Sequence, residues 1–194
     1  MKKQMITFTT ILWSTAFLSL SPFAQALVPP PGGGYPNLHT ALGDNALFNS
    51  IGGIGNTAVG WYSQWGNIAN SFNTSLGAGA LLLDVNDCRP YCQSVNTAVG
   101  AAALLLNSGT DNTAVGAFAL LNNIDGSNNN SLGHEALFMH VTGSFNNAVG
   151  ANALYSDQNG SSNNAFGESA LSSNVGGIKQ HRGGRSGAYE QHWR

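Results

Sequence analysis

One pattern of apolar and polar positions repeats along most of this chain. Residues 112–121, Asn-Thr-Ala-Val-Gly-Ala-Phe-Ala-Leu-Leu, show it in full, and near-copies run from residue 39 to residue 172. Each copy contains one glycine in register, and successive glycines lie 17, 17, 23, 16, 17, 17 and 17 residues apart. These glycines are Gly43, Gly60, Gly77, Gly100, Gly116, Gly133, Gly150 and Gly167. A fixed period of this length predicts a solenoid, which is a stack of similar coils.

Positions counted from this glycine define columns that stacked coils would superpose. Position −2 is Ala or Ser, position −1 is apolar, position +3 is Ala or Ser, and position +4 is Leu except for Gln64. We expect the −1 and +4 columns to fill the interior and the small residues at −2 and +3 to keep each coil narrow. Position −4 is asparagine in seven copies, namely Asn56, Asn73, Asn96, Asn112, Asn129, Asn146 and Asn163. We expect each of these amides to bond the amide of the next coil, about 4.8 Å away.

The repeat predicts an all-β fold, a parallel β-roll or solenoid of about eight 17-residue coils. In each coil we expect a short strand, a bend that glycine permits, a second short strand and a polar loop. A helical reading is the alternative, because Ala-Leu-Leu favours helix. The six or seven residues between the glycine and the next polar cluster are too few for a stable helix, so we favour the β interpretation.

Position +5 is apolar in seven of the eight copies. It is occupied by Phe48, Trp65, Leu82, Leu105, Leu121, Phe138 and Tyr155, and then by Ser172. Adjacent residues of a strand point to opposite faces, so an inward +4 column implies an outward +5 column. A continuous apolar column on a surface marks an interface. We therefore expect the solenoid to form homo-oligomers along its length, unless a loop of the same chain covers this column.

The segments before the repeats predict export. A basic start (residues 1–3), an apolar run (residues 5–20) and a small-x-small ending (residues 24–26) are typical of a secretory signal peptide cleaved after Ala26. A membrane anchor is the alternative, but threonine and serine interrupt the run, which is short for a bilayer span. Residues 27–36 then form a linker rich in proline and glycine. The mature chain is thus expected to lack a membrane span and to be secreted or displayed on a cell surface.

The repeat domain, residues 37–177, and the tail, residues 178–194, differ in charge. The repeat domain has Arg89 as its only cation against eight acidic residues, a net charge of −7, whereas the tail has a net charge of +3. The tail could contact an acidic partner, but its glycines and lack of apolar periodicity favour a disordered, solvated end. The acidic repeat domain argues against a nucleic-acid partner.

Two cysteines interrupt the only oversized repeat, in an insertion at about residues 83–92. Cys88 and Cys92 flank Arg-Pro-Tyr, and proline favours a tight turn that could bring the thiols together. An exported protein lies where disulfides persist, so we expect a disulfide that staples this loop. Redox and metal-binding roles are the alternatives. They fit less well, because a redox motif has two intervening residues and a metal site needs further ligands.

The repeat units resemble a known family. Residues 96–100 (Asn-Thr-Ala-Val-Gly) and 129–133 (Asn-Asn-Ser-Leu-Gly), with the Ala-Leu that follows, are similar to the head repeats of trimeric autotransporter adhesins of the YadA type, which also occur in phage tail-fibre proteins. The resemblance covers residues 37–177, without the family's stalk and membrane anchor. It implies a left-handed β-roll that packs side by side as a trimer on a bacterial surface and binds host cells or matrix proteins.

Motifs for catalysis are weak. His134-Glu135 and His140 approximate a zinc-protease motif, but the second histidine lies two residues too late to share a helical face. One acidic residue per coil is too few for a strong calcium site. We therefore expect no enzyme, no catalytic or metal site and no cofactor.

Three functions remain. The first is a secreted structural or adhesive protein that binds surfaces or partners through a solenoid face. The second is a self-assembling extracellular filament, because solenoid ends expose unpaired strands. The third is an ice-binding solenoid that uses the −3 threonines, which are Thr40, Thr57, Thr74, Thr97 and Thr113.

Overall fold

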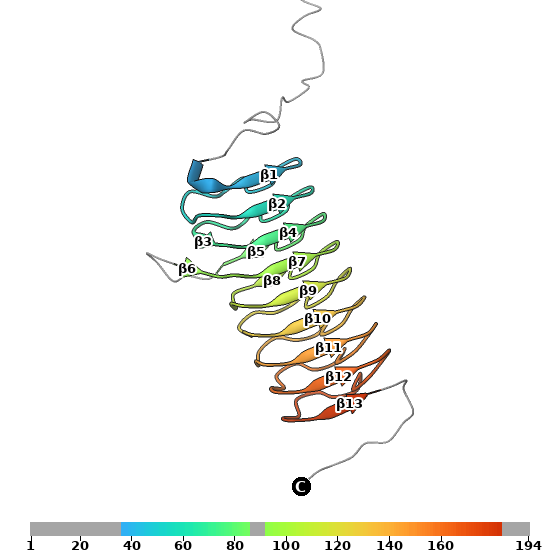
Figure 1. The fold of residues 1–194 in the computed structure, drawn as a ribbon. Helices are drawn as coiled ribbons and strands as arrows, with labels where there is room; N and C mark the ends of the chain where they lie inside the picture. Colours follow the sequence, from blue (N-terminus) through green and yellow to red (C-terminus); the bar gives the residue numbers. More distant parts are fainter. Residues whose placement is uncertain (1–35, 86–91, 184–194) are drawn as a thin grey trace, which may run out of the picture. The chain divides into compact units, whose positions relative to one another are not determined.

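The computed structural model of this chain describes residues 36–85 and 92–183. The predicted signal peptide, the linker up to residue 35, Cys88 and the side chain of Cys92 lie outside the described residues. Within them the chain forms strands, turns and one short 3-10 segment, η1 (Pro36–Leu38), and no α-helix. The predicted all-β parallel solenoid is confirmed, and Figure 1 shows its coils stacked in sequence order. No helix in these two ranges is long and apolar enough to cross a membrane.

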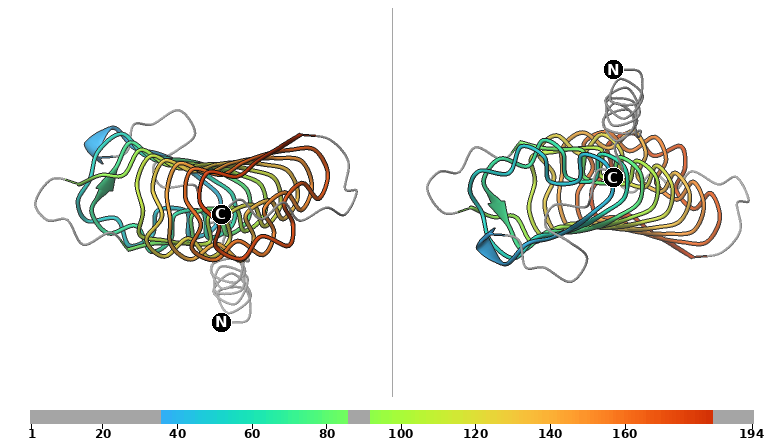
Figure 2. Two further views of the ribbon diagram at one scale, coloured as in Figure 1. Left: turned by 90° about the horizontal axis from the view of Figure 1, so that it is seen from below. Right: turned by 90° about the horizontal axis from the view of Figure 1, so that it is seen from above.

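A parallel sheet with one three-residue strand from each coil forms one wall of the solenoid. Its strands are β1 (Thr40–Leu42), β2 (Thr57–Val59), β4 (Thr74–Leu76), β7 (Thr97–Val99), β9 (Thr113–Val115), β10 (Asn130–Leu132), β11 (Asn147–Val149), β12 (Asn164–Phe166) and β13 (His181–Gly183). Equivalent positions pair throughout, and Thr97 pairs with both Thr74 and Thr113. The 23-residue and 16-residue steps therefore leave the register of the sheet unchanged. We number the coils 1 to 8 by their column glycine, and Figure 2 shows each displaced sideways from the one before.

The solenoid runs further than predicted. Strand β13 pairs with β12, and Ser161 pairs with Ile178 in a parallel bridge. The sequence interpretation ended the repeats at residue 177, because the column pattern fades there. Backbone hydrogen bonds do not require that pattern, so a ninth partial coil forms over residues 178–183.

The prediction of a second strand in every coil is wrong. Only two short further pairs form in the described residues: β3 (Asn70–Ser71) with β6 (Cys92–Gln93), and β5 (Leu83–Asp84) with β8 (Leu106–Asn107). Elsewhere the segment after the glycine is a series of turns in which positions +2 and +4 adopt positive φ, between 49° and 63°. This geometry sends alternate N–H groups to opposite neighbours. Phe118 donates to Ala101 of the preceding coil, and Leu120 donates to Ala136 of the following coil, each at 2.9 Å.

The interior is lined by positions −2, +3 and +4. In coils 3 to 7 the +3 alanines and +4 leucines are fully buried, and they join the −2 alanines in one apolar cluster from Ala80 to Ala170. A second, smaller cluster contains Ala41, Leu47 and Ala58. Ser63 and Gln64 of coil 2 separate the two clusters, because both are buried and polar.

The predicted inward position of the −1 column is wrong. Strand residues alternate between faces, so buried −2 residues direct −1 and −3 outward. Leu42 and Leu76 are accordingly 48% and 50% exposed, while Ala58 and Ala98 at −2 are fully buried.

Candidate interaction surface and the polar columns behind it

The +5 side chains lie at the surface beside the buried +4 leucines. Phe48 is 68% exposed, and the six later apolar members, from Trp65 to Tyr155, are half-buried. Phe138 and Tyr155 of successive coils stack with ring centroids 5.2 Å apart and planes 4° apart. The structure therefore places the predicted interface residues in one continuous, partly exposed column.

Two further apolar columns reach the surface, and sequence reasoning missed both. The first is the −1 column of the sheet, with Leu132 and Phe166 among its exposed members. The second is position +8, with exposed residues at Ile51, Ile68, Val85, Ile124 and Val175. The period of two within each strand could have revealed the first, and aliphatic residues in six of eight copies could have revealed the second.

Position −3 forms a polar column on the outer face of the sheet. Threonines occupy it in coils 1 to 5 and asparagines in coils 6 to 8. Asn130 donates through Nδ2 to Oδ1 of Asn147 at 2.9 Å, and Asn147 donates in the same way to Asn164 at 2.7 Å. Asn164 Nδ2 then lies 2.9 Å from Nδ1 of His181. The amide-to-amide ladder that we expected at −4 therefore forms at −3, on the outer face of the sheet. At −4 the expected bond is found between Asn146 Nδ2 and Asn129 Oδ1, at 3.0 Å.

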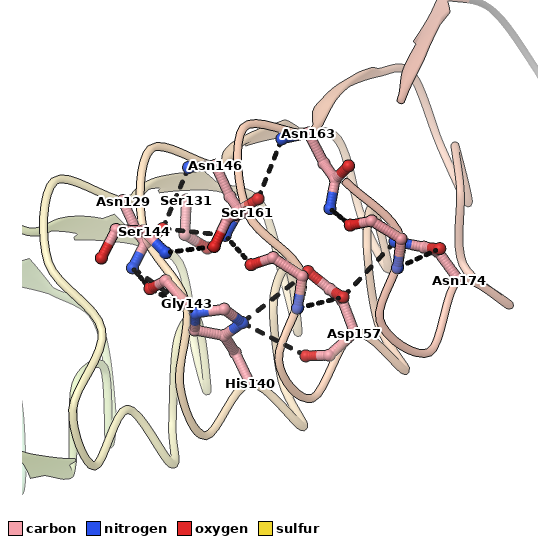
Figure 3. Close-up of polar contacts among 12 residues, drawn as sticks. Asn129, Ser131, His140, Gly143, Ser144, Asn146, Asp157, Ser161, Asn163 and Asn174 are labelled. Atoms are coloured by element: carbon pink, nitrogen blue, oxygen red, sulfur yellow. Dashed lines mark hydrogen bonds and ion pairs between the residues drawn. The ribbon is translucent and has the colours of Figure 1, made fainter. Parts of the chain in front are cut away.

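The −4 asparagines form a different ladder inside the solenoid. All seven are fully buried. The Oδ1 atom of Asn112 accepts a hydrogen bond from the backbone N–H of Asn129 at 2.9 Å, and its Nδ2 donates to the carbonyl of Gly126 at 2.8 Å. Figure 3 shows the same bonds at Asn129 and Asn146. Each amide thus satisfies backbone groups of its own coil and the next, which buried backbone requires.

Coil 1 has a histidine at this position, and it continues the ladder. His39 Nδ1 accepts a hydrogen bond from the backbone N–H of Asn56 at 3.1 Å. Burial lowers the pKa of His39, which keeps Nδ1 free to accept. The histidine therefore takes the acceptor role of the asparagine Oδ1.

Position +7 forms a second buried polar column, which sequence reasoning also missed. Its members in coils 2 to 7 are Asn67, Asp84, Asn107, Asn123, His140 and Asp157. Neighbours are linked in part: Asn123 Nδ2 donates to Asn107 Oδ1 at 2.7 Å. The sequence signal was an Asn, Asp, Ser or His at this position in every copy.

Asp84 is a buried acid held by amides and a hydroxyl. Its Oδ2 accepts hydrogen bonds from Asn73 Nδ2 at 2.8 Å and Ser94 Oγ at 3.1 Å, and its Oδ1 accepts one from Asn107 Nδ2 at 2.9 Å. Burial nevertheless raises the pKa of Asp84 to about 6. A carboxylate fits here because three donors converge on it and an amide could accept from only one side.

His140 and Asp157 form a buried pair in coils 6 and 7 (Figure 3). His140 Nδ1 lies 3.8 Å from Asp157 Oδ2, and its Nε2 lies 3.2 Å from the carbonyl oxygen of Gly143. Burial lowers the pKa of His140 and raises that of Asp157 to about 6. Both side chains are 0% exposed, so a substrate in solvent cannot reach this pair. It serves to fill and connect the +7 column.

The described residues contain no group of three or more His, Cys, Asp or Glu side chains placed to hold a metal ion. The predicted disulfide stays a prediction, since Cys88 lies outside the described ranges. Comparison of the chain with models of protein families, with curated proteins and with solved structures finds no match.

Proposed function

We propose that this protein is a secreted structural or adhesive solenoid that self-associates and binds surfaces through its outward columns. The observation that carries the proposal is the partly exposed apolar +5 column, since the interior behind it is already filled by the +3 and +4 columns. An exposed apolar strip of this length, on a rigid scaffold of hydrogen-bonded coils, favours burial against another molecule.

The partner that fits the +5 column best is a second copy of the same chain. The aromatic and aliphatic members recur at the coil spacing, so two solenoids laid side by side can match them coil by coil. The resemblance to YadA-type heads supports a trimer and a left-handed coil.

Export is tested by expressing the full chain with its own N-terminus and sequencing the mature protein. A chain that begins at Leu27 in the extracellular fraction supports the proposal. Retention of the intact N-terminus inside the cell contradicts it.

A filament subunit is the second candidate, and the ends of the sheet favour it. In the described sheet β1 and β13 each have one neighbour, so each leaves one edge open to pairing. Negative-stain microscopy of the mature protein at high concentration separates the two candidates. Discrete particles exclude the filament, and rods of growing length support it.

Ice binding is a weaker candidate. The outward threonines at −3 in coils 1 to 5 favour it, and the bonded asparagines of coils 6 to 8 interrupt the array. A measurement without thermal hysteresis removes this candidate.

A further inference from the structure

Coil 2 carries an exposed group of aromatic side chains, which we call the aromatic cluster: Trp61, Tyr62 and Trp65. The rings of Trp61 and Tyr62 meet edge to face with centroids 4.4 Å apart, and those of Tyr62 and Trp65 lie 6.0 Å apart. Trp61 is 59% exposed, and the other two are half-buried. An indole that remains this exposed in an otherwise satisfied coil is available to a ligand.

The aromatic cluster lies between polar residues of coil 1 and small residues of coil 3. Asp44 and Asn45 of coil 1 occupy the same columns as Trp61 and Tyr62, and the Tyr62 N–H donates to the Asp44 carbonyl at 2.9 Å. Ala78 and Gly79 occupy those columns in coil 3. A Cβ added at Gly79 would meet only a leucine methyl at 3.9 Å, so the space there is open.

Directed hydrogen bonds fix the turn that carries the aromatic cluster. Gln64 Nε2 donates to the Thr57 carbonyl at 2.8 Å and to Ser75 Oγ at 2.9 Å, while Gln64 Oε1 accepts from Asn67 Nδ2 at 3.0 Å. Ser63 Oγ lies 2.5 Å from Ser75 Oγ. A platform held in this way loses little conformational entropy when a ligand binds.

The chemistry of this surface favours a neutral saccharide. Residues 36–85 contain no lysine or arginine, so an anionic ligand finds no counter-charge among them. A sugar ring presents an apolar face of C–H groups that packs on an indole, and hydroxyls at its rim that bond carboxylate and amide oxygens. We propose that the aromatic cluster is a binding site for a neutral polysaccharide chain, with Trp61 as the stacking platform and Asp44 and Asn45 as hydrogen-bond partners.

A second copy of this chain fits the cluster less well. Self-association along a solenoid uses a column that continues over many coils, as the +5 column does. Among the described coils, Trp61 is the only aromatic at +1, apart from His134. Trp65 belongs to the +5 column, but Trp61 and Tyr62 do not, so the two surfaces can be separated by mutation.

The inference deepens the proposed adhesive role by naming the class of partner, and it rests on that role. The test is a pull-down of the mature full chain on microcrystalline cellulose and on chitin. We expect the wild type to bind at least one of them, and Trp61→Ala to weaken that binding about tenfold or more. Phe118→Ala is the matched control, because Phe118 is an exposed aromatic turn residue of coil 5, and it should leave binding unchanged.

Several outcomes overturn the inference. A wild type that binds neither polysaccharide overturns it, as does equal loss in Trp61→Ala and Phe118→Ala. Loss of self-association in Trp61→Ala with unchanged polysaccharide binding assigns the cluster to a second copy instead. If Trp61→Ala fails to fold by circular dichroism, Asp44→Ala replaces it and should weaken binding several-fold. Self-association of the wild type is measured in parallel. A failure to bind polysaccharide therefore does not decide whether the proposed oligomer forms.

Discussion

Coils 2 and 5 have the same backbone conformation, but the interior of coil 2 is polar and that of coil 5 is apolar. In coil 5 the +3 and +4 positions hold Ala119 and Leu120 in the apolar cluster, whereas coil 2 holds Ser63 and Gln64 in a hydrogen-bonded network. The +4 residue has a φ of 50° in both. The coil is therefore defined by its backbone ladder, its glycine and its −4 asparagine, and the interior has only to be filled by satisfied groups.

The glycine column should be the most sensitive element, and equally so in both coils. Gly60 and Gly116 have φ of 132° and 136°, and a Cβ on either would lie 2.4 Å from the carbonyl oxygen of the next column glycine. We expect Gly60→Ala and Gly116→Ala each to cost about 4 kcal/mol or more, measured by urea unfolding. Gly52→Ala is the control, since its nearest contact is 3.4 Å, and it should cost under about 1 kcal/mol. A mild effect at either column glycine would contradict a shared backbone requirement.

A glutamine placed in the leucine column tests whether partners, rather than polarity, decide the interior. Leu120→Gln would have a hydroxyl equivalent to one that binds Gln64, because Ser131 corresponds to Ser75, and Asn123 corresponds to Asn67 although its Nδ2 already donates to Asn107 and Gly126. Leu137→Gln would meet Ala148 and His140 at those places. We expect Leu137→Gln to cost about 3–5 kcal/mol and Leu120→Gln about 1–2 kcal/mol less. Equal unfolding midpoints for the two variants would contradict this explanation.

A substitution in the buried −4 asparagine ladder should reduce stability more than a substitution in the outer −3 column. Asn112→Ala leaves the N–H of Asn129 without a partner inside the solenoid, and it removes one of the two donors to the carbonyl of Gly126, which keeps Asn123 Nδ2. The expected cost is about 2–4 kcal/mol. Asn147→Thr is the control, because threonine occupies the same −3 position in coils 1 to 5, and it should change stability by less than about 1 kcal/mol. The stabilities of both variants are compared by thermal unfolding. An Asn147→Thr variant that loses as much stability as Asn112→Ala would contradict the prediction.

The buried carboxyl group of Asp84 should make stability depend on pH, whereas Asn67 and Asn107, at +7 of the adjacent coils, do not titrate. Its pKa in the folded chain is about 6, above the ordinary 3.8, so the folded state holds the proton more tightly than the unfolded chain. The contribution of Asp84 to stability is therefore largest below about pH 4 and is lost as pH rises through 6, a change of up to about 3 kcal/mol from this group. Asp157, with its pKa also raised to about 6, adds in the same direction. Asp84→Asn should reduce the slope of the profile between pH 4 and 7 and leave the part that Asp157 contributes, and an unchanged slope would exclude Asp84 as a source.

The sequence predicted the architecture well because the repeated residue types, glycine and asparagine, have few structural roles. Glycine at 0 and asparagine at −4 recur because a positive φ and paired backbone groups permit few alternatives. The second strand was a wrong prediction, since leucine at +4 gives no sign of positive φ. Its conformation is imposed by hydrogen bonds to both neighbouring coils, as at Leu120.

The surface and the buried polar columns were harder to predict. The −1 residues are apolar, and apolar residues are usually assigned to a core. Here the coil is so narrow that the residues at −2, +3 and +4 fill it, and the residue at −1 lies outside. Buried polar residues such as Asp84 and His140 looked like loop residues, because their partners come from coils that only the folded structure brings together.

Sedimentation equilibrium of the mature protein at micromolar concentrations tests the central claim most directly. The +5 column predicts an assembly heavier than the monomer, and the proposed resemblance to YadA-type heads makes three chains the expected number. Leu121→Asn should shift the assembly toward monomer without loss of fold. Position +5 accepts a polar residue in coil 8, where Ser172 occupies it, so this variant should not disturb the coil. A wild-type chain that remains strictly monomeric would contradict the assignment of the +5 column as an interface.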